Sequence, residues 1–311
     1  MRAQTVDLTE VEIAQLNERV STGPSAFAAA EIRLEEFIDL DEYPLHDMTS
    51  PKRQDLVQHC RAELVEHGCS HVPDFILPSA VAAMRDEALR LLPNAIYADD
   101  NNNPYFTPDD PSLPTDHPVR FFQKRTSAYI NSDLLEPYST LRKIYDSDVV
   151  LHFICECINA GPIYRWADPL GRNPYSVMQD GDYFPWHFDG NDFTVSILVQ
   201  ESDEGGVFEY RPYVRSPENE NYAEVKAVLH GAREGVRELP LKNGDLQLFR
   251  GRHSMHRVTE TKGDTARIIA LPTYHTNPYL MNRPHHAKTL YGRYLPIHAE
   301  RDMARTDHLT D

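Results

Sequence analysis

The strongest constraint on the fold is a run of strict alternation in the second half of the chain. From residue 193 to 200, Phe, Val, Ile and Val take every second position. A period of two is typical of a β-strand that buries one face. Gly205-Gly206 after this run predicts a hairpin into a second strand, and Asn243-Gly244 is the strongest short hairpin signal of the chain. The further strands expected in this half cover residues 207–210, 236–241, 245–249, 257–258 and 267–271.

The first half is patterned differently, with apolar residues at helical spacing. Leu56, Val57 and Leu64 suit one face of an amphipathic helix, and Gly68 is placed to end it. Before the second half we expect one short strand, over residues 70–76. Helices followed by strands predict an α+β fold with a double-sheet jelly-roll core. Helices are expected over residues 8–40 (with Thr9 as N-cap), 55–66, 78–92, 133–146, 148–159 and 217–229.

The chain of 311 residues is long enough for one large domain. We expect a helical N-terminal arm over residues 1–50, a domain over 51–300 with its jelly-roll core at about 160–280, and a tail over 301–311. Residues 93–118 are rich in Asp, Asn and Pro without an apolar period, which predicts a long loop. Such a loop often serves as a lid or binding loop, and a surface excursion fits its composition equally well.

Charge and cysteine content exclude several classes of protein. The formal net charge is −17 and no basic stripe is present, which argues against nucleic-acid binding. No apolar run reaches the length of a membrane span, and the N-terminus has no signal-peptide pattern. We therefore expect a cytoplasmic protein without nucleic-acid or membrane partners, and a homodimer stays open. The cysteines form no paired CxxC motifs, which favours reduced thiols at Cys60, Cys69, Cys155 and Cys157.

His187 and Asp189 are separated by one residue just before the alternating run. In an extended strand both side chains point to the same side and can bind one ion together. A later histidine, His256, would complete the two-histidine, one-carboxylate set of non-haem iron(II) oxygenases, which leaves coordination positions open. His253 is the rival third ligand. Other histidines lie in a Pro/Asn-rich segment and are expected to be solvated: His275, His285 and His286.

Arg267 follows His256 by eleven residues, in the next expected strand. A guanidinium group offers a planar fork to a carboxylate, whereas a lysine offers a point charge. A fixed cation beside an iron site therefore suits the far end of a dicarboxylate cosubstrate. The two histidines, the aspartate and this arginine form a specific pattern together, although none of them does so alone.

This set of four residues resembles the Fe(II)/2-oxoglutarate-dependent oxygenases, whose core is a double-stranded β-helix (jelly-roll or cupin-like) with N-terminal helices packed on one sheet. The segments 186–189, 193–200, 205–206, 244–246 and 254–259 resemble more narrowly the branch of free amino-acid halogenases and their hydroxylase relatives. The resemblance covers roughly residues 55–295. It implies Fe(II), 2-oxoglutarate as cosubstrate and O2 as oxidant. The metal ligands that it implies are His187, Asp189 and His256.

The resemblance also implies how the cosubstrate is held and what is made. Arg267 would bind the second carboxylate of 2-oxoglutarate, and the hydroxyl of Tyr175 would assist it, unless Tyr175 is a core residue. Halogenases of this branch carry Gly or Ala at the position of Asp189, which leaves space for chloride. Because the carboxylate is present here, hydroxylation of a C–H bond is expected, with succinate and CO2 as coproducts. Desaturation and oxidative cyclisation remain open.

For the substrate, the resemblance suggests a free amino acid or a related carboxylate. An arginine ahead of the jelly roll and a threonine after the cosubstrate arginine would engage the substrate carboxylate, here Arg125 (with Arg120 as rival) and Thr273. Phe184 stands where relatives that read a lysine-like substrate carry a histidine, which indicates a more apolar side chain. Asn191 and Trp186 would line the mouth of the site, with packing as the alternative for Trp186.

Two other classes of function fit part of the same pattern. A zinc hydrolase could use the same three ligands and an activated water, without need of Arg267 or O2. A jelly-roll binding protein with a degenerate site would be inert. The intact set of four residues favours the oxygenase.

Overall fold

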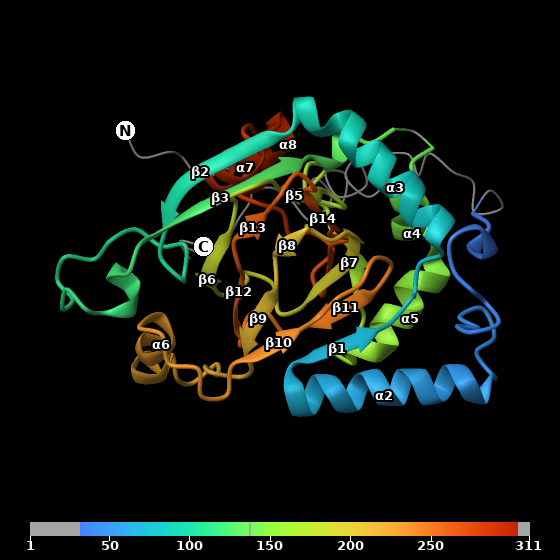
Figure 1. Cartoon of the computed structure of the whole chain (residues 1–311), viewed down its shortest axis with the longest axis horizontal. Helices are drawn as coiled ribbons and strands as arrows, with labels where there is room; N and C mark the ends of the chain where they lie inside the picture. Colours follow the sequence, from blue (N-terminus) through green and yellow to red (C-terminus); the bar gives the residue numbers. More distant parts are fainter. Residues whose placement is uncertain (1–31, 137, 304–311) are drawn as a thin grey trace.

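The computed structural model describes residues 32–136 and 138–303. Residues 8–31 of the expected helix over 8–40 lie outside the described residues. Residues 304–311 of the expected tail over 301–311 also lie outside them. The protein is an α+β structure in which antiparallel strands form two main sheets (Figure 1). None of the described helices is both long and apolar enough to cross a membrane.

The larger sheet has seven strands and the smaller sheet has four. In spatial order the larger sheet consists of β1 (Cys69–Val72), β11 (Leu246–Phe249), β7 (Thr194–Gln200), β14 (Arg267–Ala270), β5 (Tyr175–Met178), β3 (Gln123–Ile130) and β2 (Ile96–Asn102). The smaller sheet consists of β10 (Arg237–Leu239), β9 (Phe208–Arg211), β12 (Met255–Val258) and β6 (Phe184–His187). Two short pairs join β8 (Glu204–Gly205) to β13 (Thr261–Lys262) and β4 (Tyr164–Arg165) to β15 (Tyr274–His275).

The chain passes repeatedly from one sheet to the other. It changes sheet between β5 and β6, between β6 and β7, between β7 and β9, and at each step from β10 to β14. Side chains of the two sheets meet in between, because the Phe249 ring lies 5.1 Å from that of Phe208 and 4.8 Å from that of His256. Alternation of this kind gives the jelly-roll arrangement that the sequence predicts.

Helices cover the outer face of the larger sheet (Figure 1). Ser50 caps α2 by accepting a hydrogen bond from the Arg53 N–H, and Gly68 ends the helix at φ 68°. The apolar sides of these helices and the sheet form the main core cluster. The covering helices are α2 (Pro51–His67), α3 (Pro78–Leu91), α4 (Thr140–Asp146) and α5 (Asp148–Ile158).

The remaining helical elements lie at the ends of loops and near the C-terminus. They are α6 (Tyr222–Leu229), α7 (Pro284–Tyr291), α8 (Pro296–Met303) and the 3-10 turns η2 (Leu34–Glu36), η3 (Leu92–Asn94), η4 (Pro118–Arg120) and η5 (Ser132–Leu134). The expected helices over 133–146 and 217–229 are therefore shorter than predicted, since each begins with turns rather than α-helix.

Three expectations need correction. Residues 32–40 contain the short 3-10 turn η2 and no α-helix. Their apolar side chains Phe37 and Ile38 are buried in the main core. Part of the expected loop 93–118 is the strand β2, which pairs with β3 over its full length. Neither glycine turn makes a hairpin, because β7 and β9, like β10 and β11, belong to different sheets.

Candidate metal centre

Three predicted ligands lie together at one end of the jelly roll. His187 ends β6, His256 lies opposite it on β12, and Asp189 follows β6 by two residues. The nearest ligand atoms of the three side chains all lie within 4.8 Å of one another. Asp189 Oδ1 is 3.7 Å from His187 Nε2 and 3.4 Å from His256 Nε2. Both imidazoles therefore turn the same nitrogen toward the carboxylate.

The other nitrogen of each imidazole is held by the backbone. His187 Nδ1 lies 2.8 Å from Pro185 O, and His256 Nδ1 lies 3.1 Å from Ser254 O. An Nδ1–H that donates to a carbonyl leaves the lone pair on Nε2, which is the form that binds a metal. Burial, followed by the charge of His256, lowers the pKa of His187 to about 3. His187 is thus neutral at physiological pH and needs no deprotonation before it binds an ion.

Asp189 is positioned by two residues that the sequence reasoning missed. The Thr194 hydroxyl donates to Asp189 Oδ2, and the Asp189 N–H donates to Gly251 O at 3.1 Å. A Cβ on Gly251 would lie only 1.9 Å from Asp189 Oδ2. Burial raises the pKa of Asp189. The two imidazoles and the Thr194 hydroxyl together lower this pKa by more than burial raises it, so the net shift is downward. Asp189 therefore stays anionic.

This donor set fits a divalent transition metal. Two neutral imidazole nitrogens and one carboxylate oxygen are the ligands of non-haem iron(II) sites with open positions. Zinc accepts the same donors, so the ligands alone do not distinguish an oxygenase from a hydrolase. The cluster is the only group of three potential His, Cys, Asp or Glu ligands found in the described part of the chain.

Arg267 supplies the feature that a hydrolase does not need. It begins β14, is 4% exposed, and pairs in register with Met178 of β5. Within residues 32–136 and 138–303 no carboxylate forms an ion pair with it, and burial alone lowers the pKa of its guanidinium, to about 10. A Cβ on Gly206 would lie 2.8 Å from Arg267 Cδ, so this glycine makes room for the side chain. A buried cation without a counter-charge fits the distal carboxylate of a bound dicarboxylate.

The predicted role of Tyr175 needs correction. Tyr175 pairs with Ala270 on β14 and with Ile130 on β3, and all three residues face the helices in the main core cluster. Arg267 is three residues from Ala270 on the same strand and therefore points to the opposite face. The Tyr175 hydroxyl donates to Glu87 Oε2 of α3 at 3.0 Å. It secures α3 to the sheet and lies away from the metal centre.

Arg125 lies on β3 near the ligands, as a substrate-binding role requires. Its guanidinium carbon is 5.3 Å from the centre of the Phe184 ring, and that ring is 4.2 Å from the His187 ring. The rival Arg120 is bound to Asp109 within its own loop, with Nε 2.9 Å from Oδ1. Of the two arginines, Arg125 is the one that the structure brings to the site.

The other predicted substrate residues are placed less favourably. Trp186 packs in a cluster with Val225 of α6 and lies under the Arg257 guanidinium at 4.9 Å, so packing replaces the predicted role at the mouth. The Thr273 hydroxyl donates to Leu271 O at 3.1 Å, and its contact with a substrate stays a prediction. Asn191 lies partly exposed in the turn between β6 and β7, and its role also stays a prediction.

The remaining polar candidates lie outside the centre. His253 is partly buried and does not belong to the three-residue cluster. The C-terminal histidines also lie outside this cluster, namely His275, His285 and His286. All four cysteines are free.

A loop that follows β2 packs against the metal ligand His187. The Phe106 ring lies 5.6 Å from the His187 ring and 6.4 Å from the Phe184 ring, and Phe106 has a left-handed φ of 54°. Asn103, which is buried, holds this turn: its Nδ2 donates to Val119 O and its Oδ1 accepts from the Thr107 N–H. The sequence signal was present, since Asn is favoured in such turns. An aromatic wall beside the metal ligands results.

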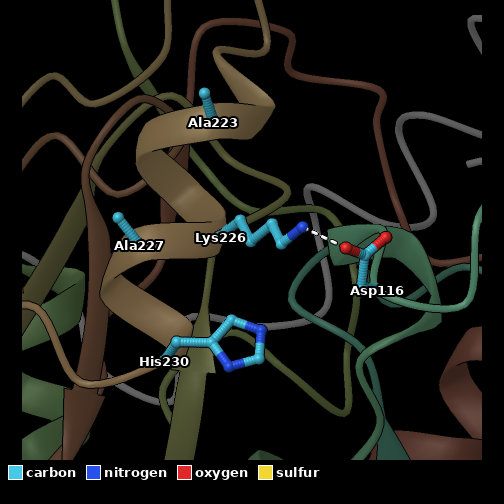
Figure 2. Close-up of a pocket in the computed structure, with 5 residues that line it drawn as sticks. All are labelled: Asp116, Ala223, Lys226, Ala227 and His230. Atoms are coloured by element: carbon cyan, nitrogen blue, oxygen red, sulfur yellow. Dashed lines mark hydrogen bonds and ion pairs between the residues drawn. The ribbon is translucent and has the colours of Figure 1, made fainter.

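The same loop is fastened to α6 at its far end. Figure 2 shows Lys226 reaching from α6 to Asp116, above His230. The His117 ring lies 4.3 Å from the Tyr222 ring, and the Phe121 ring lies 5.5 Å from the His230 ring. An open surface hollow of about 450 Å³ lies between these elements. It is lined by none of the metal ligands and is therefore separate from the metal centre.

Comparison with known proteins places these features in a family. The model of the family described as Halogenase D matches residues 52–290, which is well over half of the chain. A search of curated proteins gives no match.

Several solved structures are similar in arrangement. A 2OG-Fe(II) oxygenase family oxidoreductase from Burkholderia pseudomallei is 12% identical, with a TM-score of 0.45 over 71% of this chain and 91% of that chain. A prolyl hydroxylase from Trichoplax adhaerens is 13% identical, with a TM-score of 0.45 over 71% and 90%. AviO1 from Streptomyces viridochromogenes is 16% identical, with a TM-score of 0.49 over 76% and 100%. These likenesses are too distant to transfer the role of any residue.

Proposed function

Because this chain belongs to the family described as Halogenase D and carries the ligand set of non-haem iron(II) oxygenases, we propose that it is an Fe(II)/2-oxoglutarate-dependent oxygenase that hydroxylates an unactivated C–H bond of a small amino-acid-like substrate. The choice of hydroxylation over halogenation rests on one observation. Asp189 is present, anionic and directed at both imidazoles, so that the third ligand position is filled by the protein. The position that a halide would need in this branch of enzymes is thus taken by a carboxylate.

The residues of the chain have distinct roles in this proposal. His187, Asp189 and His256 would hold Fe(II), and Arg267 would hold the distal carboxylate of 2-oxoglutarate. When bound, the iron supplies activation of O2 at the expense of 2-oxoglutarate, which becomes succinate and CO2 while one oxygen atom enters the substrate C–H bond. Phe106 and Phe184 pack against the His187 ring and would shield this ligand from water.

Substrate placement is assigned to Arg125. Its buried guanidinium would bind the substrate carboxylate and hold the reacting carbon next to the metal. The Phe184 ring lies between this arginine and His187, and the Phe106 ring lies beside it. Both rings favour an apolar substrate side chain, which agrees with the absence of a histidine at position 184.

The test is a screen of free amino acids and related carboxylates for stimulated succinate formation under air with Fe(II) and 2-oxoglutarate. We expect at least one compound to stimulate succinate formation and to gain one oxygen atom by mass spectrometry. A loss of two hydrogens would instead show desaturation or cyclisation, and incorporation of chlorine would overturn the argument from Asp189. Activity that persists without O2 would select the zinc hydrolase.

Variants separate the assigned roles. We expect Arg267→Ala to weaken 2-oxoglutarate binding by at least tenfold, because removal of one charge-assisted pair costs about 1.5–3 kcal/mol. Titration of 2-oxoglutarate against the metal-loaded protein without O2 measures this directly. An unchanged affinity would contradict the role given to Arg267.

A further inference from the structure

Asp100 and Arg125 form an ion pair at the edge of the larger sheet. They stand opposite one another on β2 and β3, so their side chains share one face. Arg125 Nη2 donates to Asp100 Oδ2 at 3.0 Å. The side chain of Arg125 is 1% exposed, whereas that of Asp100 is 35% exposed. The guanidinium of Arg125 is thus buried, whereas a solute can reach the carboxylate of Asp100.

The shared face is the one that looks toward the metal centre. Tyr129 follows Arg125 by four residues on β3 and lies on the same side of the strand. Burial raises the pKa of Tyr129, and the charges of both Arg125 and Asp189 act on its hydroxyl. By contrast, Ala128 and Ile130 face the helical core. Asp100 and Arg125 therefore lie on the interior wall that also contains Arg267.

Arg125 keeps hydrogen-bonding capacity that the protein does not use. Its Nε is buried and has no hydrogen-bond partner in the part of the chain that the structure describes. A buried donor without a partner has lost its hydrogen bonds to water without replacing them, which costs stability. A ligand carboxylate that accepted from this nitrogen would remove the cost and would lie one aromatic ring, that of Phe184, away from His187.

We propose that Asp100 binds the ammonium group of an α-amino acid whose carboxylate is bound by Arg125. The proposal deepens the function proposed above and rests on it. The two charged groups of an α-amino acid are attached to one carbon, so their receptor must hold a cation and an anion side by side, as this pair is held. The zwitterion carries no net charge, so the formal charge of −17 does not oppose its approach.

The test compares acids that differ only in the amino group. The twenty common L-amino acids are titrated into the full chain loaded with Fe(II) and 2-oxoglutarate without O2, and the heat of binding is measured. For each amino acid that binds, the carboxylic acid of the same skeleton without the amino group is titrated as well. We expect the amino acid to bind at least tenfold more tightly than its amine-free counterpart.

Asp100→Asn should abolish this discrimination. The amino acid should lose at least tenfold in affinity, whereas the amine-free acid should bind equally well or better, because Arg125 no longer has a competing anion. Asp99→Asn is the matched control. Asp99 is the neighbouring residue of β2, lies on the opposite face and pairs with exposed Lys124 at 3.0 Å. This control should bind both acids as the wild type does.

Three outcomes would overturn the proposal. The first is that none of the amino acids binds, and the second is that discrimination survives in Asp100→Asn. The third is that both acids lose affinity equally in that variant, which would make Asp100 a positioning residue for Arg125. Each of these outcomes leaves open the oxidation of a carboxylate without an amino group. The proposed dependence on 2-oxoglutarate fails separately, if the metal-loaded chain does not bind 2-oxoglutarate.

Discussion

At the scale of single residues, glycines shape the metal centre as much as its ligands do. Gly251 leaves the space that the Asp189 carboxylate occupies, and Gly206 leaves the space for the stem of Arg267. Ligand spacing indicated His187, Asp189 and His256, because their chemistry is specific to few residue types. Glycine is common in turns for other reasons, so spacing alone could not identify these two as part of the centre.

Gly251→Ala should therefore damage the metal site without touching a ligand. The new Cβ would lie 1.9 Å from Asp189 Oδ2, so the carboxylate must move away from the imidazoles. We expect divalent-metal affinity to fall by about 10–100-fold, as for other residues that orient ligands. Equilibrium dialysis with Co(II) measures it.

Gly190→Ala is the control for this substitution. Gly190 adjoins Asp189, and its Cβ would meet no atom within 4 Å. Its metal affinity should match that of the wild type. Equal affinity in Gly251→Ala as well would show that Asp189 adapts freely and that its placement is not set by Gly251.

At the scale of elements, the sequence predicted which segments are strands better than it predicted their partners. The alternating run appears as β7, and 78–92 appears as α3. The turn at Gly244, with φ 98°, needs glycine whether or not it closes a hairpin. Its N–H donates to Leu198 O and its O accepts from the Ile76 N–H. The turn thus leads the chain from one sheet to the other, and only long-range contacts decide this.

β2 shows the opposite difficulty. Its residues include Asp99, Asp100, Asn101 and Asn102, which are turn formers and lack an apolar period. The strand forms because its backbone pairs with β3 along its whole length at the edge of the sheet. Edge strands need little apolar surface and often carry charge. Propensity therefore indicated a loop where the partner strand imposes an extended conformation.

The contact between α2 and α5 gives a prediction at this scale. Arg53, on α2, is buried and binds Glu156 of α5 through two hydrogen bonds of 3.0 and 2.8 Å. Glu156→Gln should reduce the free energy of unfolding at pH 7 by about 2 kcal/mol, between the values for exposed and buried pairs, because the Glu156 side chain is 31% exposed. Urea unfolding measures the loss.

The pH dependence of this loss has a definite sign. The hydrogen bonds from Arg53 lower the pKa of Glu156, so the pair stabilises the fold above the unfolded-state pKa of about 4.3 and ceases to do so as pH falls through the lower folded-state pKa. The difference between wild type and variant should shrink in acid. Glu136→Gln, which breaks an exposed pair with Arg90, should cost less than about 1 kcal/mol. A similar loss in both variants would contradict the importance of burial.

At the scale of the whole molecule, the candidate site depends on how the two sheets face one another. The smaller sheet contributes both histidines, and the larger sheet contributes Arg267 and Arg125. The resemblance to known oxygenases implied that these residues meet. The structure gathers the three metal ligands and brings Arg125 next to Phe184, which contacts His187. It places Arg267 on the face of the larger sheet that is opposite the helical core, and the contact of Arg267 with a cosubstrate stays a prediction. The resemblance could not place Tyr175 correctly. A residue on a buried strand has apolar neighbours on both faces, and the spacing of Tyr175 from His187 does not reveal which face Tyr175 occupies.

This arrangement predicts an order in which ligands stabilise the molecule. Arg267 offers a bound 2-oxoglutarate one carboxylate contact, and the keto-acid end requires the metal. A divalent metal at 100 times its Kd should add about 2.7 kcal/mol to the free energy of unfolding, or about 5 °C in Tm for a chain of this size. 2-Oxoglutarate alone should shift Tm by less than about 1 °C, and after Mn(II) it should raise Tm further.

His256→Ala should lose both shifts, whereas His253→Ala, outside the cluster, should keep them. If 2-oxoglutarate raised Tm equally with and without metal, the two sheets would not share one binding site.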